Sequence, residues 1–429
     1  MRTGIEELYA RFRDSNGVST DTRNIIPGSI FFALKGERFN ANTFAGEALE
    51  RGARWVVIDE EQYATDDRCL LVSDVLETLQ RLARHHRRQL NIPVVALTGS
   101  NGKTTTKELT HAVLSKKYRT HATRGNLNNH IGVPLTLLSI GSETEIAVVE
   151  MGANHTGEIK LLCTIADPTH GFITNIGKAH IGTFGGYENI VRAKSELYDH
   201  LRARDGIAFV DAGQTLLMEK SAGIRQRLFY PRKGDDYHAE LIAADPFVRI
   251  RAENGEEVRT KLVGGYNFEN IACALCIGKF FGVDAEVANA AIAEYTPGNM
   301  RSQAMKTETN TIILDAYNAN PSSMQVAIEN FAAMQAQEKV LILGDMFELE
   351  EEADREHRAI GKRIKDLGFA HVYLCGELFK AALHEIPYAR YFPKKEELVH
   401  ELQQFPLRNA TILIKASRGM GLETIVEHL

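Results

Sequence analysis

Apolar residues along this chain follow two alternating patterns over most of its length. Short apolar runs predict buried strands, and longer segments with apolar residues three or four positions apart predict helices. In the middle of the chain the expected strands are 94–98, 145–150, 171–176 and 207–210. The helices expected with them are 103–115, 156–166, 188–203 and 268–281. This alternation is typical of a mainly parallel sheet that is covered by helices.

The last part of the chain repeats this alternation on a smaller scale. Strands are expected at 311–316, 339–343, 371–375 and 411–415. The helices between them are expected near 322–335, 353–367 and 395–404, which indicates a compact Rossmann-like unit. Between 236 and 263 the pattern changes to short alternating strands, which predicts an antiparallel extension of the middle unit.

The beginning of the chain forms a further unit. Its expected elements are a strand at 29–34, a helix at 41–51, a strand at 55–58 and a helix at 76–90. A chain of 429 residues is too long for one ordinary core. We therefore expect an α/β protein of three domains: a small N-terminal α/β domain (1–90), a central domain with a parallel sheet and a phosphate-binding loop (91–297), and a C-terminal Rossmann-like domain (298–429).

Charge and composition narrow the possible partners and the compartment. A formal net charge of −6 gives no basic field for nucleic acid or an anionic membrane, and the basic run 85–88 is expected to be a solvated helix face. No secretory leader is evident, and no apolar run approaches the roughly 20 residues that span a bilayer. The five cysteines are scattered, and Cys273 and Cys276 are expected to be buried thiols of one helix. We therefore expect no nucleic acid, no membrane insertion and a cytoplasmic location.

The most informative stretch joins the strand at 94–98 to the helix after it. It reads T-G-S-N-G-K-T-T from Thr98 to Thr105, a variant phosphate-binding loop whose first glycine is Gly99. Glycines let backbone N–H groups surround phosphate oxygens, and the helix that begins near Lys103 adds the positive end of its dipole. Lys103 can reach the β- and γ-phosphates, and Thr104 can bind Mg²⁺ through its hydroxyl. The alternative is a glycine-rich turn that binds nothing. The candidate ATP-binding residues here are Gly99, Ser100, Asn101, Gly102, Lys103, Thr104 and Thr105.

Polar residues also follow the other expected strands, where ligands bind in open parallel sheets. Glu150 is well placed to hold Mg²⁺, and the alternative is a helix cap or a solvated residue at the strand end. His180 lies in the glycine-rich turn 177–185 and is either a ligand or a structural histidine. The asparagine-rich segments 125–134 and 315–321 are candidate ligand loops, with plain turns as the alternative. The charge run 348–352 is expected to be the exposed start of a helix.

Taken in order, these motifs resemble the Mur ligases, ATP-dependent amide-forming enzymes that build the stem peptide of peptidoglycan. The resemblance covers essentially the whole chain. The motifs that carry it include 19–23, 31–36, 98–105, 126–134, 150–152, 175–182, 192–196, 267–270, Arg301, 315–321, 343–346 and 415–419. The segments 317–321 and 344–346 favour the member of the family that adds D-alanyl-D-alanine. Departures occur at Tyr266, Ala416 and 40–42, where relatives often carry His, Gly and Asp-Gly-His.

The resemblance assigns roles to individual residues of this chain. The UDP-sugar peptide is expected at Thr20, Thr22, Arg23, Lys35, Asn128 and Asn129. Asn267 and Asn270 are expected near the adenine, and Arg301 and Asp315 at phosphate and ribose. The dipeptide is assigned to Asn318, Asn320, Ser417 and Arg418. The catalytic residues are expected to be Lys103, Glu150, His180 and Lys194.

The implied cofactors are ATP and two Mg²⁺ ions. The metal ligands expected are Thr104, Glu150, His180 and Lys194, with Lys194 carried as a carbamate, the anionic CO₂ adduct of its amine. The implied activity joins UDP-N-acetylmuramoyl-tripeptide to D-alanyl-D-alanine through an acyl phosphate, with the three domains closing over the substrates. A monomer is expected. The alternatives are another Mur-type or folylpolyglutamate-like amide ligase, or a P-loop ATPase that acts as a conformational switch.

Overall fold

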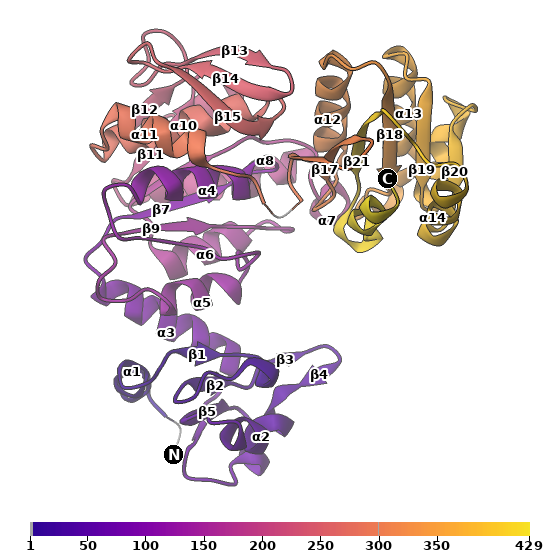
Figure 1. The fold of residues 1–429 in the computed structure, drawn as a ribbon. Coiled ribbons are helices and arrows are strands. Elements are labelled where there is room, and N and C mark those ends of the chain that lie inside the picture. Colours follow the sequence, from indigo (N-terminus) through magenta and orange to yellow (C-terminus); the bar gives the residue numbers. More distant parts are fainter. Residues whose placement is uncertain (1–2, 299) are drawn as a thin grey trace.

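The computed structural model describes residues 3–298 and 300–429 and has three α/β domains, each built around its own sheet (Figure 1). The N-terminal sheet has the order β1-β2-β5-β6 and is parallel throughout. Its strands are β1 (Val18–Ser19), β2 (Ile30–Phe32), β5 (Trp55–Ile58) and β6 (Cys69–Leu71). Helices α1 (Ile5–Arg13) and α2 (Ala45–Glu50) belong to this domain, and a small hairpin, β3 (Lys35–Gly36) and β4 (Phe39–Asn40), projects from it.

Helix α3 (Val75–Gln89) connects the N-terminal and central domains. It packs against α1 on one side and against α5 (Gly132–Leu138) and α6 (Glu158–Ala166) on the other. The prediction of a solvated basic face was wrong for two of its residues, since His86 and Arg87 are buried. Arg87 donates from Nε to the Ala166 carbonyl oxygen at 2.9 Å, at the end of α6. The Arg87 guanidinium thus satisfies a carbonyl oxygen at the C-terminus of α6, where a positive charge stabilises the helix.

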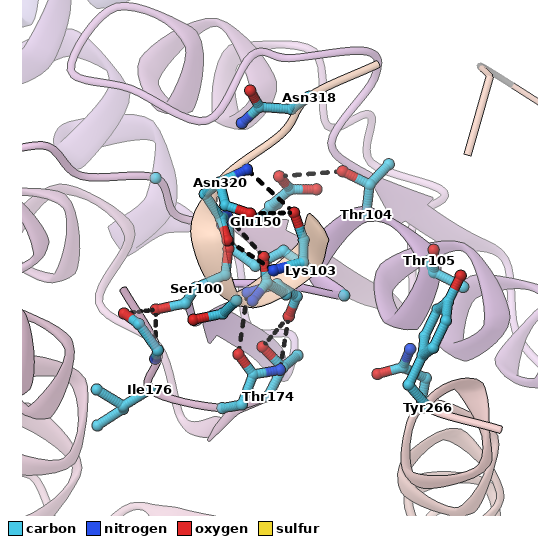
Figure 2. Close-up of a pocket in the computed structure, with 18 of the residues that line it drawn as sticks. Ser100, Lys103, Thr104, Thr105, Glu150, Thr174, Ile176, Tyr266, Asn318 and Asn320 are labelled. Atoms are coloured by element: carbon cyan, nitrogen blue, oxygen red, sulfur yellow. Dashed lines mark hydrogen bonds between the residues drawn. The ribbon is translucent and has the colours of Figure 1, made fainter. Parts of the chain in front are cut away.

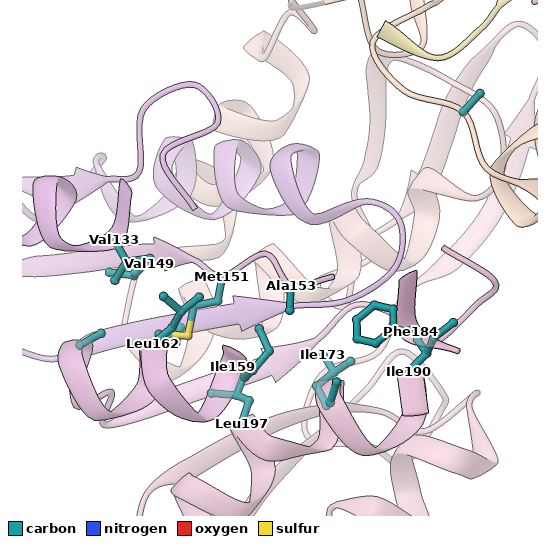
Figure 3. Packing of buried hydrophobic residues seen from close by; sticks show 14 of the residues in the cluster. Val133, Val149, Met151, Ala153, Ile159, Leu162, Ile173, Phe184, Ile190 and Leu197 are labelled. Carbon is teal, nitrogen blue, oxygen red and sulfur yellow. The ribbon is translucent and has the colours of Figure 1, made fainter. Parts of the chain in front are cut away.

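The central sheet is parallel and has the order β12-β11-β10-β7-β9-β8. Its strands are β7 (Val94–Thr98), β8 (Thr120–Ala122), β9 (Ile146–Glu150), β10 (His170–Ile173), β11 (Ile207–Asp211) and β12 (Gln226–Tyr230). Alternate residues of each strand enter two separate cores. Figure 3 shows the core beneath α5, α6 and α8 (Tyr187–Ala203), where Val149 and Ile173 meet Leu162 and Leu197. The opposite face packs on α4 (Lys103–Leu114), α10 (Asn267–Phe280) and α11 (Ala285–Glu294). Short helices α7 (Ile181–Phe184) and α9 (Thr215–Lys220) pack in the first of these two cores, together with α5, α6 and α8.

An antiparallel sheet extends the central domain, as the sequence predicts. Its strands are β13 (Glu240–Ala244), β14 (Phe247–Arg251) and β15 (Glu257–Val263), paired in that order. Val248, Ile250 and Val258 join the same core as α10, so the extension rests on the helices that cover the parallel sheet.

The C-terminal sheet has the order β16-β17-β21-β18-β19-β20, with only β16 antiparallel among the described strands. Its strands are β16 (Gln303–Lys306), β17 (Thr311–Asp315), β18 (Lys339–Gly344), β19 (His371–Cys375), β20 (Arg390–Phe392) and β21 (Thr411–Lys415). Its helices are α12 (Pro321–Ala333), α13 (Ala353–Asp366) and α14 (Lys395–Gln404). The 3₁₀ helices of the chain are η1 (Thr22–Asn24), η2 (Ala41–Phe44), η3 (Glu61–Tyr63), η4 (Glu350–Glu352), η5 (Leu378–His384), η6 (Arg418–Met420) and η7 (Leu422–His428).

Most long elements agree with the sequence prediction to within a few residues, and the three-domain α/β class is confirmed. The short elements α5, α9, β8 and β12 were missed, because a few residues carry little periodicity. Helix α11 was also missed, since its alanine-rich sequence gives a weak contrast between its faces. The prediction of a helix over 41–51 was partly wrong, because 41–44 form the 3₁₀ helix η2. Cys273 and Cys276 are buried free thiols, as predicted. No helix of the described residues is long and apolar enough to cross a membrane.

Candidate functional site

A cavity of about 1000 Å³ lies where the carboxyl ends of the central strands face the C-terminal domain. Loops after β7, β9, β10, β11 and β12 line it from the central domain, and the loops around β17 and the start of α12 line it from the C-terminal domain. Figure 2 shows its centre, with the phosphate-loop residues Ser100, Lys103 and Thr104 next to Glu150. Ligands bind at this edge of open parallel sheets.

The phosphate loop is held in place by the end of the neighbouring strand β10. Ser100 donates from Oγ to the Gly177 carbonyl oxygen at 2.9 Å, and the Asn101 N–H donates to Asn175 Oδ1 at 3.0 Å. Gly102 has a left-handed φ of +78° and precedes the first residue of α4, where a Cβ would press against the amide of Asn270. The sequence therefore places free N–H groups of a helix start at the floor of the cavity, an arrangement suited to phosphate.

Lys103 lies inside the curve of this loop. Its Nζ donates to the carbonyl oxygens of Gly99 at 2.7 Å and Ser100 at 3.3 Å. Burial lowers the pKa of Lys103 to about 8, and the nearby carboxylate of Glu150 opposes that shift. Phosphate oxygens near this ammonium would favour its charged form.

Glu150 ends β9 and is buried beside the loop. Its Oε1 accepts hydrogen bonds from Asn128 Nδ2 at 2.8 Å and from Thr104 Oγ1 at 3.4 Å. Its Oε2 has no hydrogen-bond partner among the described residues. A buried carboxylate oxygen without a partner, next to a threonine hydroxyl, is a donor set that suits a hard cation such as Mg²⁺.

His180 and Lys194, the other expected metal ligands, are held by other partners. His180 lines the cavity, and its Nδ1 contacts the carboxylate of Glu348 from the C-terminal domain. Glu348 is exposed and stands just before η4 and α13, as predicted, and its pairing with His180 across the domains is an additional contact. Lys194 is buried in α8, where its Nζ donates to the Ala153 carbonyl oxygen at 3.2 Å. Across residues 3–298 and 300–429, no three His, Cys, Asp or Glu side chains converge as a metal site.

The C-terminal domain contributes a polar wall to the cavity. The Arg301 guanidinium lies 3.9 Å from the centre of the Tyr317 ring. Asp315 is paired with Lys415 at 2.6 Å, and Asn320 donates from Nδ2 to Asn101 Oδ1 at 2.8 Å. Asn318 also lines the cavity, next to Asn320 in Figure 2.

Ser417 and Arg418, assigned to the dipeptide by sequence, do not line this cavity. The hydroxyl of Ser417 accepts a hydrogen bond from the Phe347 N–H at 2.9 Å, and Arg418 pairs with Glu423 at 3.0 Å. Both side chains are therefore engaged within the C-terminal domain.

Several other expected ligands have internal partners. Asn270 donates to Asn267 Oδ1 at 2.9 Å and accepts from Thr106, so the two amides hold α10 against the phosphate loop at the cavity wall. Asn129 accepts hydrogen bonds from the N–H groups that open α5.

The remaining residues assigned to the UDP-sugar peptide lie on the N-terminal domain, outside the cavity lining. Thr20 follows β1 and Thr22 begins η1. Arg23 is exposed and pairs with Asp21 at 2.8 Å, and Lys35 pairs with Asp59 at 3.0 Å. The N-terminal domain that carries these residues lies at the far end of the molecule from the C-terminal domain (Figure 1).

Sequence reasoning missed one end of the cavity. Its additional lining residues are Asp211, Gln214, Arg232, Tyr266 and Glu269. Asp211 directly follows the expected strand 207–210, so a search of the carboxyl end of that strand would have found it, and recognition of β12 (Gln226–Tyr230) would have added Arg232. Tyr266 was noted only as a departure from the family.

Several polar contacts join the central and C-terminal domains beside the cavity, among them the hydrogen bond from Asn320 to Asn101 described above. In addition to His180 with Glu348, Lys178 pairs with Glu356 at 3.0 Å and its N–H donates to Ser322 Oγ at 2.9 Å. Glu356 is buried, which strengthens its ion pair relative to an exposed one. These contacts keep the C-terminal domain against the phosphate-loop region.

Replacing both Glu348 and Glu356 with glutamine is expected to loosen this arrangement. Loss of the two ion pairs shifts the equilibrium of the free protein toward more extended forms by up to about thirtyfold, because two pairs worth up to about 1 kcal/mol each contribute up to about 2 kcal/mol together. Small-angle scattering measures this as a larger radius of gyration, with Glu351→Gln, an exposed neighbour, as the control. Identical profiles for all three proteins would contradict the expectation.

Comparison with known proteins adds independent information. A family model described as the Mur ligase middle domain matches residues 97–278, and one described as the Mur ligase, glutamate ligase domain matches residues 300–418. The chain is 35% identical to the UDP-N-acetylmuramoyl-tripeptide–D-alanyl-D-alanine ligase of Bacillus subtilis, over 96% of this chain and 93% of that protein.

Solved structures are similar over the same extent. A crystal structure of MurF from Acinetobacter baumannii superposes with a TM-score of 0.87 at 31% identity, covering 98% of this chain and 97% of that one. The MurF ligase of Thermotoga maritima in complex with ADP superposes with a TM-score of 0.85 at 28% identity, covering 97% of each chain.

Proposed function

This chain belongs to the Mur ligase family, and we propose that it joins D-alanyl-D-alanine to UDP-N-acetylmuramoyl-tripeptide at the expense of ATP, in peptidoglycan precursor synthesis. The observation that carries the proposal is the unpartnered Glu150 oxygen beside the phosphate loop, in a cavity walled by two domains. Two relatives that are 35% and 33% identical over 96% of this chain are named UDP-N-acetylmuramoyl-tripeptide–D-alanyl-D-alanine ligases.

The reaction must activate a carboxylate, which is a poor acylating agent. A carboxylate oxygen of the tripeptide attacks the γ-phosphorus of ATP, and the bond to the β-phosphate oxygen breaks to give an acyl phosphate and ADP. The amine of the dipeptide then attacks the acyl carbon, loses a proton and expels inorganic phosphate. Lys103 and the loop N–H groups stabilise the charge on the transferring phosphoryl group, so positioning and electrostatics are the main tasks of the protein.

The donor set beside the loop fits a magnesium ion. Thr104 and Glu150 would hold it, and Glu150 already carries one oxygen without a protein partner. When bound, Mg²⁺ supplies positive charge for the β- and γ-phosphate oxygens. A second Mg²⁺ is part of the proposal and would use His180 and a carbamate on Lys194, once His180 leaves Glu348.

The environment of Lys194 supports a carbamate there. Only a neutral amine adds CO₂, and burial together with the Lys103 cation lowers the pKa of Lys194 to about 7. Near pH 7 the amine of Lys194 is therefore neutral in a substantial fraction of the molecules. The adduct is an anion with two oxygens, the ligand type that Mg²⁺ prefers, and a bound cation would compensate its buried charge.

In this proposal each domain has a separate role in binding the substrates. Residues 1–90 bind the UDP-sugar through Thr20, Thr22, Arg23 and Lys35, residues 91–297 bind ATP, and residues 298–429 close over both. Asn318 and Asn320 remain the proposed dipeptide contacts, since they line the cavity. The chain is proposed to act as a cytoplasmic monomer, a compartment in which its five free cysteines stay reduced.

Phosphate release tests the proposed ligase directly. Purified protein with ATP, Mg²⁺, UDP-N-acetylmuramoyl-tripeptide and D-alanyl-D-alanine is expected to release phosphate in step with formation of the pentapeptide product, measured by mass spectrometry. Omitting either peptide substrate should reduce steady release to background, because ATP is cleaved by the bound carboxylate rather than by water. Rapid release with ATP alone, unchanged by both peptides, would instead indicate a switch ATPase.

A further inference from the structure

The backbone that presents Arg301 to the cavity is strained on both sides of that residue. Met300 and Ser302 have φ values of +55° and +46°, in the left-handed region that residues other than glycine rarely adopt. Met300 Sδ accepts a hydrogen bond from Arg418 at 3.0 Å. The Ser302 N–H donates to Asp315 Oδ1 at 3.3 Å. Strained backbone persists only where its surroundings hold it, so contacts within the C-terminal domain set the position of Arg301.

The guanidinium of Arg301 is a half-buried cation in the cavity wall. Its Nε has no hydrogen-bond partner among the described residues. The carboxylate of Asp315 is paired with Lys415 at 2.6 Å. After burial, the Arg301 cation also acts to lower the pKa of Lys103, so the two positive charges lie close to each other. Two neighbouring cations that face one cavity suit the phosphate groups of a nucleotide.

Tyr317, two residues after β17, contacts this guanidinium with its ring. The Arg301 Cζ lies 3.9 Å from the ring centre, well within the range of a cation–π contact. Stacking occupies the flat face of a guanidinium and leaves its N–H donors, which lie in the plane of the group, available to an anion. A carboxylate partner would instead use these donors and cancel the charge. The ring of Tyr317 therefore orients Arg301 without neutralising it.

The same ring also lies near a second arginine, Arg418. The Arg418 Cζ is 5.8 Å from the centre of the Tyr317 ring, and its guanidinium is paired with Glu423 at 3.0 Å. Because Arg418 does not line the cavity, its contact with the ring supports the cavity wall from within the C-terminal domain.

We propose that Tyr317 is a positioning residue for phosphoryl transfer, and that its ring holds the Arg301 guanidinium with its N–H donors toward the phosphoryl group that leaves ATP. The inference rests on the proposed ligase function and adds the residue that orients one of its cations. Without the ring, the long Arg301 side chain would lose rotamer freedom only when the nucleotide binds or reacts. Donors that are already in place stabilise the developing charge without this reorganisation.

Turnover of four variants tests this role. Arg301→Ala is expected to lower kcat about 100-fold, the scale of one preorganised donor group. Tyr317→Leu removes the ring and should lower kcat about tenfold, whereas Tyr317→Phe keeps the ring and should retain about half of kcat or more. The double variant Arg301→Ala/Tyr317→Leu should be no slower than Arg301→Ala, because the ring acts only through the guanidinium.

Nucleotide binding gives a second readout that does not depend on turnover. Calorimetry compares ADP with adenylyl imidodiphosphate, a non-hydrolysable ATP analogue that carries the terminal phosphoryl group. The preference for the analogue over ADP should fall about threefold in Tyr317→Leu and stay unchanged in Tyr317→Phe. The control is Trp55→Leu, which removes a ring from a similar stack with Arg11 at 4.2 Å in the N-terminal domain and should change neither kcat nor this preference. Thermal unfolding verifies that each variant is folded.

The outcomes separate this inference from the proposed function. A wild-type protein that binds both nucleotides but forms no product would refute the ligase function, and the nucleotide preference would still test Tyr317. A wild-type protein that binds neither nucleotide would refute both. An unchanged kcat and preference in folded Tyr317→Leu, equal losses in the leucine and phenylalanine variants, or additive losses in the double variant would overturn the role of Tyr317 alone.

Discussion

Replacing Lys103 with alanine is expected to abolish ligase activity, with a loss of turnover of about 10³-fold or more. Its ammonium is the partly buried cation at the centre of the phosphate loop and donates to two loop carbonyl oxygens. A preorganised charge in a water-excluded site is worth far more than the same charge at a surface. The variant is measured by product formation with all substrates, and its fold by thermal unfolding.

A matched control exists in the same region of the chain. Lys117 also donates its ammonium to two backbone carbonyl oxygens, those of Phe281 and Gly282, yet it lies on the exposed surface. Lys117→Ala should therefore keep nearly full activity. A Lys103→Ala protein that retains even one tenth of wild-type turnover would exclude the proposed role of the phosphate loop.

The parts of the molecule that were predictable from sequence are those fixed by local pattern. Strands such as Val94–Thr98 and Thr411–Lys415 are short apolar runs, and such a run predicts a strand that is buried on both faces. The phosphate loop was found for the same reason, since glycines, lysine and threonines stand in consecutive positions. Because ligands bind at the carboxyl ends of parallel strands, the sequence also predicts that Glu150 and Thr104 serve the same site. The 3.4 Å contact between Thr104 Oγ1 and Glu150 Oε1 agrees with this prediction.

The parts that were not predictable depend on contacts between distant segments. Arg87 looks like a surface cation in sequence, and only the packing of α3 on α6 buries it against the Ala166 carbonyl. Asn128 lines the cavity, and its hydrogen bond to Glu150 arises only when the chain folds. His180 meets Glu348 from another domain, 168 positions later in the chain. Such pairs leave no local signal, because neither residue type nor spacing identifies the partner.

Lys194→Ala is expected to lower turnover by about 100-fold while leaving affinity for the UDP-sugar peptide nearly unchanged. The reason is that Lys194 is buried in the central domain, where it donates to the Ala153 carbonyl oxygen, and lies close enough to Lys103 for that cation to lower its pKa. Losing an anion that orients charge at a phosphoryl-transfer site costs activity on this scale. Turnover and calorimetric binding, measured on the same preparation, separate the two effects.

Three comparisons make the carbamate itself testable. Lys194→Arg keeps a cation but cannot form the adduct, so it should be as inactive as Lys194→Ala. The control is Lys160→Ala, which changes an exposed lysine of α6 and should leave the protein active. Acetate should partly restore Lys194→Ala by supplying a carboxylate in the vacated space, and should do nothing for Lys194→Arg, whose side chain fills it. Wild-type protein equilibrated with ¹³C-bicarbonate should show a carbamate carbon signal that is absent from both variants. A fully active wild-type protein without that signal would exclude the carbamate, and Lys194 would then act through its buried ammonium.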